Sequence, residues 1–215
     1  MTVSVEMHES RHAGIIVYKM RYVVGIDEAG RGPLAGPVAV GAVAIPLHFN
    51  KKFFRSIRDS KQLTPEEREL WFQLAIEAKK NRELDFHVSL VSERVIDRHG
   101  ISYALRLGIK RCLAELNLAE ESQIFLDGAL KAPQKFTHQL TVIRGDEKIP
   151  IISLASIVAK VIRDRKMVRL SKKFPEFNFD MHKGYGTSLH RQAIQKFGST
   201  VIHRQSFLTR LTRHR

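Results

Sequence analysis

The amino-acid sequence predicts a mixed α/β domain, and three observations lead to that fold class. Apolar runs of strand length alternate with longer segments in which apolar residues recur at helical spacing. Two or three strands come first and helices interleave with further strands afterwards, an order that favours a mixed sheet over a doubly wound one. With 215 residues, of which 43% are hydrophobic, the chain can bury a substantial core without disulfides or structural metals.

The first elements are predicted from two apolar runs and a helix start signal. Residues 22–27 form a buried strand, and residues 38–45, bounded by prolines, form a second strand that pairs with it through a wide connection. Thr64 is an N-cap hydroxyl, followed by proline at the first helical position and by a glutamate three residues after the cap. We therefore expect a helix from this point to about Lys80.

The middle of the chain is predicted as a strand followed by a helix. Residues 86–91 alternate as a half-buried strand does. Residues 101–118 form a helix, because one face carries the side chains of Ala104, Leu105, Ile109, Cys112, Leu113 and Leu116. Cys112, the single cysteine, is therefore expected to be a small core residue rather than a nucleophile.

The remaining elements are two short strands and two helices. Residues 123–128 form a strand that ends in a carboxylate and a glycine, and residues 140–143 form another. Residues 151–173 form a helix that is apolar in its first half and basic later. A final helix is expected to start at Thr187 or Ser188.

The charge of the chain predicts a polyanionic partner. The formal net charge is +14, and no acidic residue occurs in residues 181–215, which favours phosphate contacts there. We expect neither a signal peptide nor a membrane span, because the longest apolar stretch, residues 149–162, is too short to cross a bilayer. Nucleic acid is thus favoured over a membrane, and the lone cysteine fits the cytoplasm. Basicity alone fits a ribosomal protein, a transcription factor or a nuclease equally well.

Carboxylates stand beside the ends of the apolar strands. Asp27 and Glu28 follow the first strand, and Asp127 and Asp146 follow later ones. Taken singly, each acid could cap a turn. Converging carboxylates would repel one another unless a cation compensates, and oxygen ligands favour magnesium or manganese over zinc. A metal that bridges carboxylates and a phosphate would reconcile these acids with a basic chain.

Strand geometry sets a condition on the first pair of acids. Adjacent residues on a regular strand point to opposite faces, so Asp27 and Glu28 cannot both face one metal site from such a strand. Either the strand ends or bulges at Glu28, or one of the two acts through its backbone carbonyl. The Ala29-Gly30 sequence that follows favours a strand end.

Several motifs in a fixed order carry a family resemblance. They are Asp-Glu-Ala-Gly-Arg-Gly-Pro-Leu-Ala-Gly-Pro-Val at residues 27–38, Asp59-Ser60-Lys61, Asp127-Gly128, Gly145-Asp146, Ala-Ser-Ile-Val-Ala-Lys-Val-Ile-Arg-Asp at residues 155–164, and His-Lys-Gly-Tyr-Gly at residues 182–186. With these motifs the chain resembles ribonuclease HII, the type 2 ribonuclease H family, from about Tyr22 to Phe207.

The resemblance implies a fold and a domain organisation. The expected fold is α/β, a ribonuclease H-like mixed β-sheet flanked by helices, with a C-terminal helical segment. Residues 1–21 would be an N-terminal extension, and residues 22–215 would form the catalytic domain. The basic helical segment of that domain would cover residues from about 175 to 215.

The resemblance also implies a reaction. Such an endoribonuclease hydrolyses RNA in RNA–DNA hybrids and cuts on the 5′ side of ribonucleotides embedded in duplex DNA, leaving 3′-hydroxyl and 5′-phosphate ends. It removes misincorporated ribonucleotides and RNA primers, and we expect a monomer. Asp27, Glu28, Asp127 and Asp146 would hold two divalent ions, Mg²⁺ or Mn²⁺. One would activate the attacking water and the other would stabilise the leaving 3′-oxygen.

Further residues match positions that bind substrate in the family. Gly30-Arg31-Gly32 matches the motif whose backbone contacts the ribose 2′-hydroxyl, and glycine allows that close approach. Tyr185 matches the tyrosine that stacks on the deoxyribose beyond the ribonucleotide. Three lysines could contact phosphates or could equally be solvated: Lys61, Lys160 and Lys183.

Asp164, His182 and His203 are less easily assigned. Asp164 follows Arg163 on a basic helix, so an ion pair with a neighbouring arginine is favoured over metal ligation. His182 and His203 could be structural or could face the substrate. A site built of carboxylates does not need them as ligands.

Three alternatives compete with ribonuclease HII, and one of them, a transposase or junction resolvase of similar architecture, would have no use for a motif that contacts a 2′-hydroxyl. Ribonuclease HIII normally carries an N-terminal substrate-binding domain and lacks the arginine-centred glycine motif, so the short extension and Arg31 favour ribonuclease HII. A non-catalytic RNA-binding protein would explain the charge. It would not explain four acids at strand ends, which would weaken RNA binding.

Overall fold

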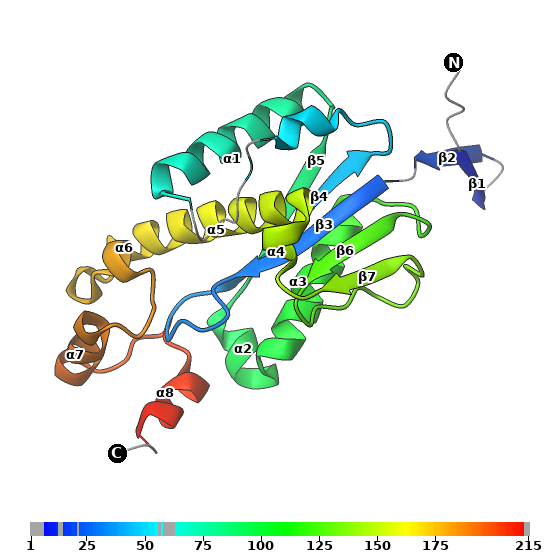
Figure 1. Ribbon diagram of the computed structural model, residues 1–215. Helices are drawn as coiled ribbons and strands as arrows, with labels where there is room; N and C mark the ends of the chain where they lie inside the picture. The colour runs from blue at the N-terminus through cyan, green and yellow to red at the C-terminus, as the bar shows by residue number, and fades with distance from the viewer. Residues whose placement is uncertain (1–6, 13–14, 21, 56, 58–62, 213–215) are drawn as a thin grey trace.

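A computed structural model describes residues 7–12, 15–20, 22–55, 57 and 63–212. Within these residues, one sheet has the strand order β5-β4-β3-β6-β7 (Figure 1). Its strands are β3 (Tyr22–Ala29), β4 (Val38–Pro46), β5 (Asp85–Val91), β6 (Gln123–Asp127) and β7 (Gln139–Val142). β3, β4 and β5 pair antiparallel, whereas β6 pairs parallel to both β3 and β7. The predicted mixed sheet and its wide hairpin are confirmed.

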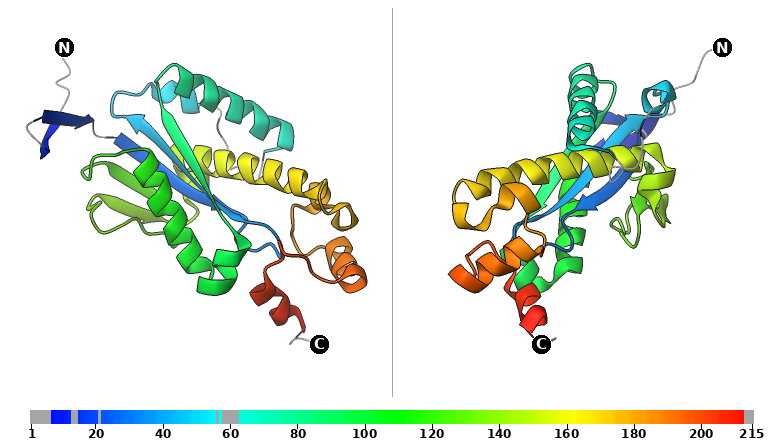
Figure 2. Two further views of the ribbon diagram at one scale, coloured as in Figure 1. Left: turned by 180° about the vertical axis from the view of Figure 1, so that it is seen from behind. Right: turned by 60° about the vertical axis from the view of Figure 1, so that its left-hand side comes forward.

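Helices cover both faces of this sheet (Figure 2). One face carries α2 (Glu93–His99) and α3 (Ile101–Glu115), and the predicted apolar side of α3, Cys112 included, is buried in the core between helix and sheet. The other face carries α1 (Pro65–Lys80) and α5 (Pro150–Ser171), whose buried side chains form a second core cluster.

The helix starts follow the local sequence signals. At α1 the Thr64 hydroxyl accepts a hydrogen bond from the Glu67 amide at 3.2 Å, and the Glu67 carboxylate accepts one from the Thr64 amide at 2.7 Å. This capping box confirms the predicted start. Likewise, α7 (Ser188–Phe197) begins after Thr187, whose hydroxyl accepts from an amide of the first turn. α3 ends three residues earlier than the expected end at residue 118.

Short elements are the ones that periodicity did not predict. Within residues 1–21, β1 (Met7–His12) and β2 (Ile15–Met20) pair antiparallel in a separate sheet. The others are η1 (Lys51–Phe54), α2, α4 (Gly145–Lys148), η2 (Pro175–Phe177), α6 (Phe179–His182) and α8 (Gln205–Thr212). Segments of three to eight residues contain too few turns for a hydrophobic period to stand out.

The C-terminal helical segment packs against the far end of α5 (Figure 1). A third core cluster joins Met167 and Leu170 of α5 to Phe177, Phe179 and Ala193. Ala35 belongs to the same cluster, so the glycine-rich connection between β3 and β4 is embedded among these helices. In the described part of the chain no helix is long and apolar enough to cross a membrane.

Candidate active site

The carboxyl-terminal ends of β3 and β6 place the first acids. The parallel pairing of these strands ends at Ile26 opposite Leu126, so Asp27 and Asp127 occupy the next, equivalent positions on neighbouring strands. Equivalent positions of neighbouring strands lie on the same face of a sheet. The register therefore brings these two carboxylates to one side of the sheet edge.

Of the two alternatives for Asp27 and Glu28, the one in which β3 ends or bulges at Glu28 is wrong, which leaves the one in which a backbone carbonyl takes the place of a side chain. The strand continues to Ala29 and pairs regularly with β4, with Asp27 opposite Gly41 and Glu28 opposite Val40. Adjacent strand residues point to opposite faces. Antiparallel pairing with β4 persists after the parallel pairing with β6 has stopped, and it holds Glu28 in extended conformation.

The three acids nevertheless influence one another electrostatically. Asp27 is 4% exposed, and its burial raises its pKa well above the ordinary value. The negative charges of Glu28 and Asp127 raise it further, while a hydrogen bond from Ser156 on α5 opposes the rise. Burial also raises the pKa of Glu28; Arg31 counters this and Asp127 adds to it. A proton or a cation would relieve this accumulation of negative charge.

Asp127 is also tied to the segment that carries the fourth predicted acid. Its Oδ1 accepts a hydrogen bond from the Gly145 amide at 2.6 Å. Asp146, the next residue, is 1% exposed, and its backbone carbonyl accepts from the Ser153 hydroxyl of α5. The backbone of α4 is thus fixed against β6 and α5, next to Asp127.

These acids are of the residue type that hard metal ions prefer, but their side chains do not lie close enough together to hold an ion. Carboxylate oxygens are the ligands that Mg²⁺ and Mn²⁺ prefer. Among the described residues, however, no three His, Cys, Asp or Glu side chains are grouped closely enough to hold a metal ion. The roles of Asp27, Glu28, Asp127 and Asp146 as catalytic groups and ligands stay predictions.

The two glycines of Gly30-Arg31-Gly32 differ in what surrounds them. Gly30 has a φ of +86°, and a Cβ there would lie 1.8 Å from Nε of Arg163. At Gly32 a Cβ would meet nothing within 4 Å. The first glycine is therefore required by the packing of Arg163. The second leaves its backbone open to an approaching ligand.

Two buried arginines, Arg163 of α5 and Arg204, hold the connection formed by residues 30–37, here called the 30–37 loop. Both side chains are 0% exposed. Arg163 donates to the carbonyls of Ala35, Pro37 and Lys183 at 3.3, 2.9 and 3.0 Å. Arg204 donates to those of Gly30, Arg31 and Gly36 at 2.7, 2.9 and 2.9 Å. Five of these six carbonyls belong to the 30–37 loop, so hydrogen bonds from the two guanidiniums fix its backbone.

These arginines also bring positive charge beneath the 30–37 loop. Burial lowers the pKa of both side chains, and in Arg204, where the Arg163 charge adds to the effect, the pKa falls to about 9. Arg204 thus remains mostly cationic at neutral pH.

Tyr185 is held by a chain of hydrogen bonds through two histidines. The Tyr185 carbonyl lies 2.9 Å from Nδ1 of His190, whose Nε2 lies 3.0 Å from Nε2 of His203. Nδ1 of His203 accepts from the Thr200 amide at 2.9 Å. The fixed donors and acceptors at the two ends assign one tautomer to each ring, and both rings must be neutral. Burial accordingly lowers the pKa of both histidines to about 4.

His182 has a similar backbone role. Its Nε2 lies 2.7 Å from the Phe177 carbonyl, and its Nδ1 accepts from the Gly184 amide at 3.2 Å. Its ring stacks on His190 with centroids 4.4 Å apart. These contacts favour a structural role for His182 and His203 over a role in contacting the substrate.

A cavity of about 430 Å³ joins most of the predicted substrate residues. Its lining includes Glu28, the Gly30-Arg31-Gly32 motif, Lys160 and Tyr185, together with Arg68 and Ser156. Lys183 lines a neighbouring cavity. Lys61 and the rest of its motif lie outside the described residues.

Asp164 forms the expected ion pair, but its nearer partner is a lysine. Its Oδ1 lies 3.0 Å from Nζ of Lys160 and 4.0 Å from the Arg163 guanidinium. On a helix Lys160 and Asp164 are one turn apart and face the same way. No metal-ligating role follows for Asp164.

Sequence reasoning did not single out several residues that shape this site: Arg68, Ser156, Arg163, His190 and Arg204. Ser156 and Arg163 lie within the 155–164 motif, and Arg204 follows His203, so the motifs held a signal that was not used. Burial of an arginine against carbonyls has no sequence pattern of its own.

Comparison with known proteins gives a consistent match. The family model described as ribonuclease HII matches residues 24–210. A ribonuclease HII from Caldicellulosiruptor bescii is 42% identical over 188 residues, which cover 87% of both chains. Ribonuclease H2 from Pyrococcus horikoshii superimposes with a TM-score of 0.66 at 30% identity, covering 86% of this chain and 93% of that one. The ribonuclease HII of a PCNA complex from Archaeoglobus fulgidus does so with a TM-score of 0.68 at 27% identity, covering 85% and 93%.

Proposed function

The chain belongs to the ribonuclease HII family, and from this premise we propose its substrates and its products. As a member it is a ribonuclease H, an endonuclease and hydrolase that acts on RNA–DNA hybrids. We propose that it also cuts on the 5′ side of single ribonucleotides in duplex DNA and leaves 3′-hydroxyl and 5′-phosphate ends. Its role would be to remove misincorporated ribonucleotides and RNA primers, as a monomer in the cytoplasm.

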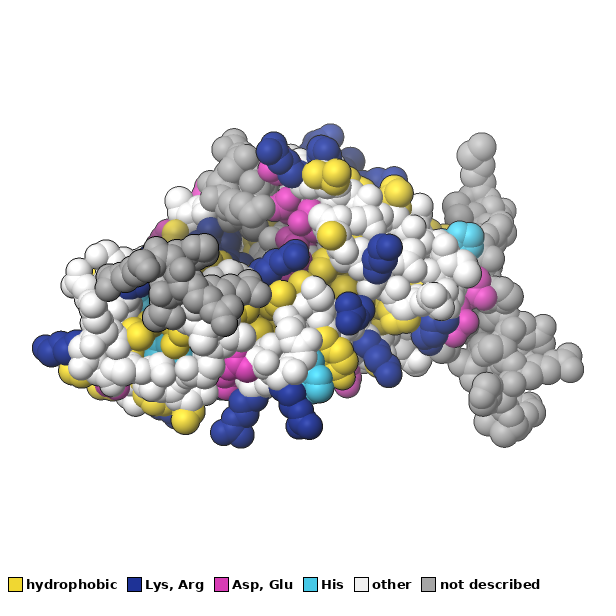
Figure 3. Space-filling model, turned by 90° about the horizontal axis from the view of Figure 1, so that it is seen from below, with side chains coloured by type: hydrophobic (Ala, Val, Ile, Leu, Met, Phe, Trp, Pro, Cys, Tyr) yellow, Lys and Arg dark blue, Asp and Glu magenta, His cyan; other side chains and the backbone are white. Residues whose placement is uncertain are grey.

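One observation carries this proposal. The cavity that is lined by Glu28 is also lined by Gly32, whose backbone is open, and by Tyr185. A reacting phosphodiester and the sugars on either side of it could therefore be held in one place. The polyanionic substrate is matched by the net charge of +14, part of which is displayed as Lys and Arg side chains on the face in Figure 3.

The acids are proposed to hold the divalent cations on which the family depends. Asp27, Glu28 and Asp127 supply oxygen ligands of the right kind, one of the two adjacent residues through its backbone carbonyl because β3 is regular at both, and the mutual repulsion of the carboxylates would be relieved by a bound cation. Asp146 would complete the set. Two ions, Mg²⁺ or Mn²⁺, supply Lewis acidity for the attacking water and the leaving oxygen when bound. Because the acids are not grouped as ligands at present, their side chains would draw together on binding.

The other residues bind and orient the substrate. Gly32 lets the backbone approach the ribose, where an amide or a carbonyl can pair with the 2′-hydroxyl. Tyr185, which is 42% exposed and fixed through its carbonyl, presents its ring to the deoxyribose beyond the ribonucleotide. Lys160 lines the same cavity and can contact a phosphate.

The test is a cleavage assay on duplex DNA that contains one ribonucleotide. Magnesium, manganese and excess chelator are compared, and the ends of the products are mapped. We expect a cut 5′ to the ribonucleotide with either metal and none with chelator. A matched all-DNA duplex is the control, and equal cutting of that duplex, or no cut with metal, would contradict the proposal.

A further inference from the structure

The carbonyl groups of Gly30 and Arg31 are turned into the protein interior. Arg204, whose side chain is 0% exposed, donates a hydrogen bond to each of them, at 2.7 and 2.9 Å. No peptide bond of the described residues is cis, so the N–H of each peptide unit points opposite to its carbonyl. The amides that share peptide units with these two carbonyls are those of Arg31 and Gly32. Both amides are therefore turned away from Arg204.

The two residues that carry these amides line the cavity beside Glu28. Arg31 and Gly32 are both exposed, and a Cβ at Gly32 would meet nothing within 4 Å. No backbone carbonyl in the described part of the chain accepts a hydrogen bond from either amide. Two successive amides on one side of the chain form a small concavity for an electronegative atom. The loop thus offers two donors to a ligand in this cavity.

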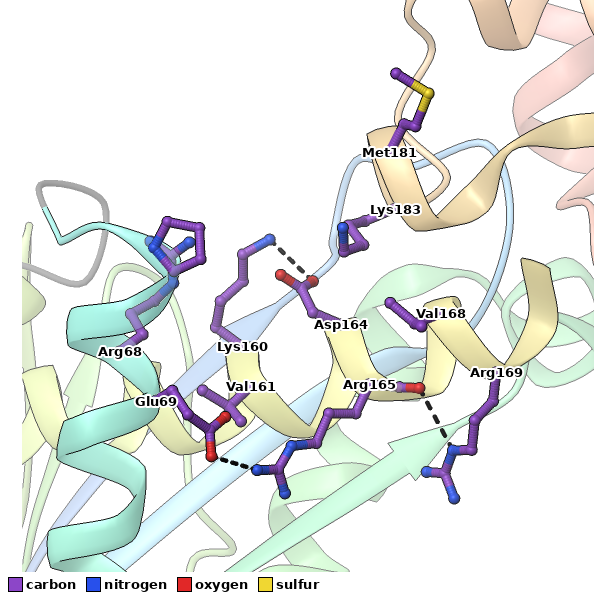
Figure 4. A pocket seen from close by; sticks show the side chains of 11 residues that line it. Arg68, Glu69, Lys160, Val161, Asp164, Arg165, Val168, Arg169, Met181 and Lys183 are labelled. Carbon is purple, nitrogen blue, oxygen red and sulfur yellow. Dashed lines mark hydrogen bonds and ion pairs between the residues drawn. The ribbon is translucent and has the colours of Figure 1, made fainter. Parts of the chain in front are cut away.

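The positive charge of Arg204 strengthens these donors. Its hydrogen bonds to the two carbonyls are charge-assisted, and hydrogen bonds on the two ends of one peptide unit reinforce each other. None of the ion pairs among the described residues involves Arg204. Arg163, in contrast, has the Asp164 carboxylate 4.0 Å away, and Figure 4 shows this carboxylate also paired with Lys160. The charge of Arg204 is therefore stabilised by the carbonyls of the 30–37 loop rather than by a carboxylate.

Contacts of the C-terminal segment hold Arg204 in place. Its amide donates to the Leu34 carbonyl at 2.8 Å. Its guanidinium lies over the ring of Phe207, 5.2 Å from the centroid. The Asp97 carboxylate accepts from the first two amides of α8, both at 2.9 Å, and so fixes the start of the helix that follows Arg204 directly. The guanidinium therefore reaches the loop from a fixed backbone.

We propose that Arg204 is a positioning residue for ribose recognition, which orients the amides of Arg31 and Gly32 and strengthens them as donors to the 2′-hydroxyl oxygen. This inference rests on the proposed function, because it requires a ribonucleotide in the cavity beside Glu28. A 2′-hydroxyl can accept these hydrogen bonds, whereas a deoxyribose has no atom at that position to accept them. Arg163 does not share the role, because its carbonyl partners lie outside residues 30–32.

The test compares ribose preference with stability. Affinity is measured in chelator for a duplex with one ribonucleotide and for the matched all-DNA duplex, and the preference is the ratio of the two dissociation constants. Arg204→Lys keeps the charge but loses the fork of donors, so the preference should fall about threefold, and Arg204→Gln, which also loses the charge, should lower it about tenfold. Affinity for the all-DNA duplex should not change.

Arg163→Lys is the matched control for these variants. It also removes a fully buried guanidinium that donates to three carbonyls. Its Tm should therefore fall as that of Arg204→Lys does, while its ribose preference should equal that of the wild type. A merely structural role of Arg204 would give the two variants the same preference.

A second measurement uses the wild type alone and needs no stable variant. The amide protons of Arg31 and Gly32 are followed by NMR as each duplex is added in chelator. The duplex with one ribonucleotide should move both resonances downfield relative to the all-DNA duplex, because a new hydrogen bond deshields an amide proton.

Three results would overturn the proposal. They are an unchanged preference in both Arg204 variants, an equal loss of preference in Arg163→Lys, and equal amide shifts with the two duplexes, which would mean that the amides hold a phosphate. Failure of the proposed function would look different. The wild type itself would then show no preference for the ribonucleotide duplex and no cleavage of it with metal.

Discussion

Replacing Gly30 by alanine should destabilise the fold, whereas replacing Gly32 by alanine should impair cleavage and leave the stability of the fold unchanged. In Gly30→Ala the new methyl would lie 1.8 Å from Nε of Arg163, at a φ of +86°. The backbone conformation costs about 1–2 kcal/mol for an L-residue. Displacing the guanidinium leaves at least one buried carbonyl unpaired, at about 1–3 kcal/mol. The free energy of unfolding should therefore fall by about 2–5 kcal/mol, which lowers Tm by roughly 5–20 °C for a chain of this size.

Gly32→Ala is the matched variant, because a methyl there meets no protein atom within 4 Å. Its Tm should stay equal or rise slightly, while kcat/KM on a duplex with one ribonucleotide should fall at least about tenfold, since the methyl occupies the approach of the sugar. Thermal denaturation and steady-state cleavage measure the two effects. Equal losses of Tm would refute the packing argument for Gly30. Wild-type cleavage by Gly32→Ala would show that the substrate does not lie on the open side of the motif.

Four further predictions concern the residues around this motif. Arg204→Lys keeps the charge but cannot reach all three carbonyls, so Tm should fall by about 2–12 °C; an unchanged Tm would contradict the role of the guanidinium. Acidification from pH 6.5 to 4 should destabilise the protein. The pKa values of His190 and His203 are lowered in the folded state, so the unfolded chain binds protons at these residues first. The Tm of His190→Asn should depend less on pH over this range, and parallel curves would count against it. Asp127→Asn should lose cleavage while binding hybrid with near-normal affinity; turnover at ordinary magnesium concentrations would exclude Asp127 as a ligand. Tyr185→Ala should impair cleavage at a single ribonucleotide more than within a long hybrid, and equal losses would argue against contact with the deoxyribose.

Most of the regular structure could be predicted because its signals are local. The capping box at Thr64 and the apolar face of α3 involve residues within a few turns of one another, and both are confirmed. The predicted end of β3 at residue 27 was wrong because the true end depends on pairing between strands and not on a local signal. Its extension through Glu28 depends on pairing with β4, and Val40, the partner of Glu28, lies twelve positions further along the chain.

The sequence predicted which residues form the candidate site, but it predicted only part of how they lie relative to one another. Glu28, Lys160 and Tyr185 are far apart in sequence and line one cavity. Asp27 and Asp127 stand at equivalent positions because β3 and β6 pair in parallel register. No local pattern encodes that register, so the sequence indicated which acids matter and could not place them relative to one another.

The sequence by itself determined the chemistry of this protein: acids directly after apolar strands, a glycine-rich connection and an excess of basic residues. Those properties depend on residue type and on near neighbours, and the motifs that carry them are contiguous. Only the tertiary structure decided that Gly30 accommodates Arg163 while Gly32 faces open space, and that Arg163 and Arg204 satisfy carbonyls of the 30–37 loop. Burial and hydrogen bonding between segments more than a hundred residues apart depend on how the chain closes on itself, and that is a property of the whole fold.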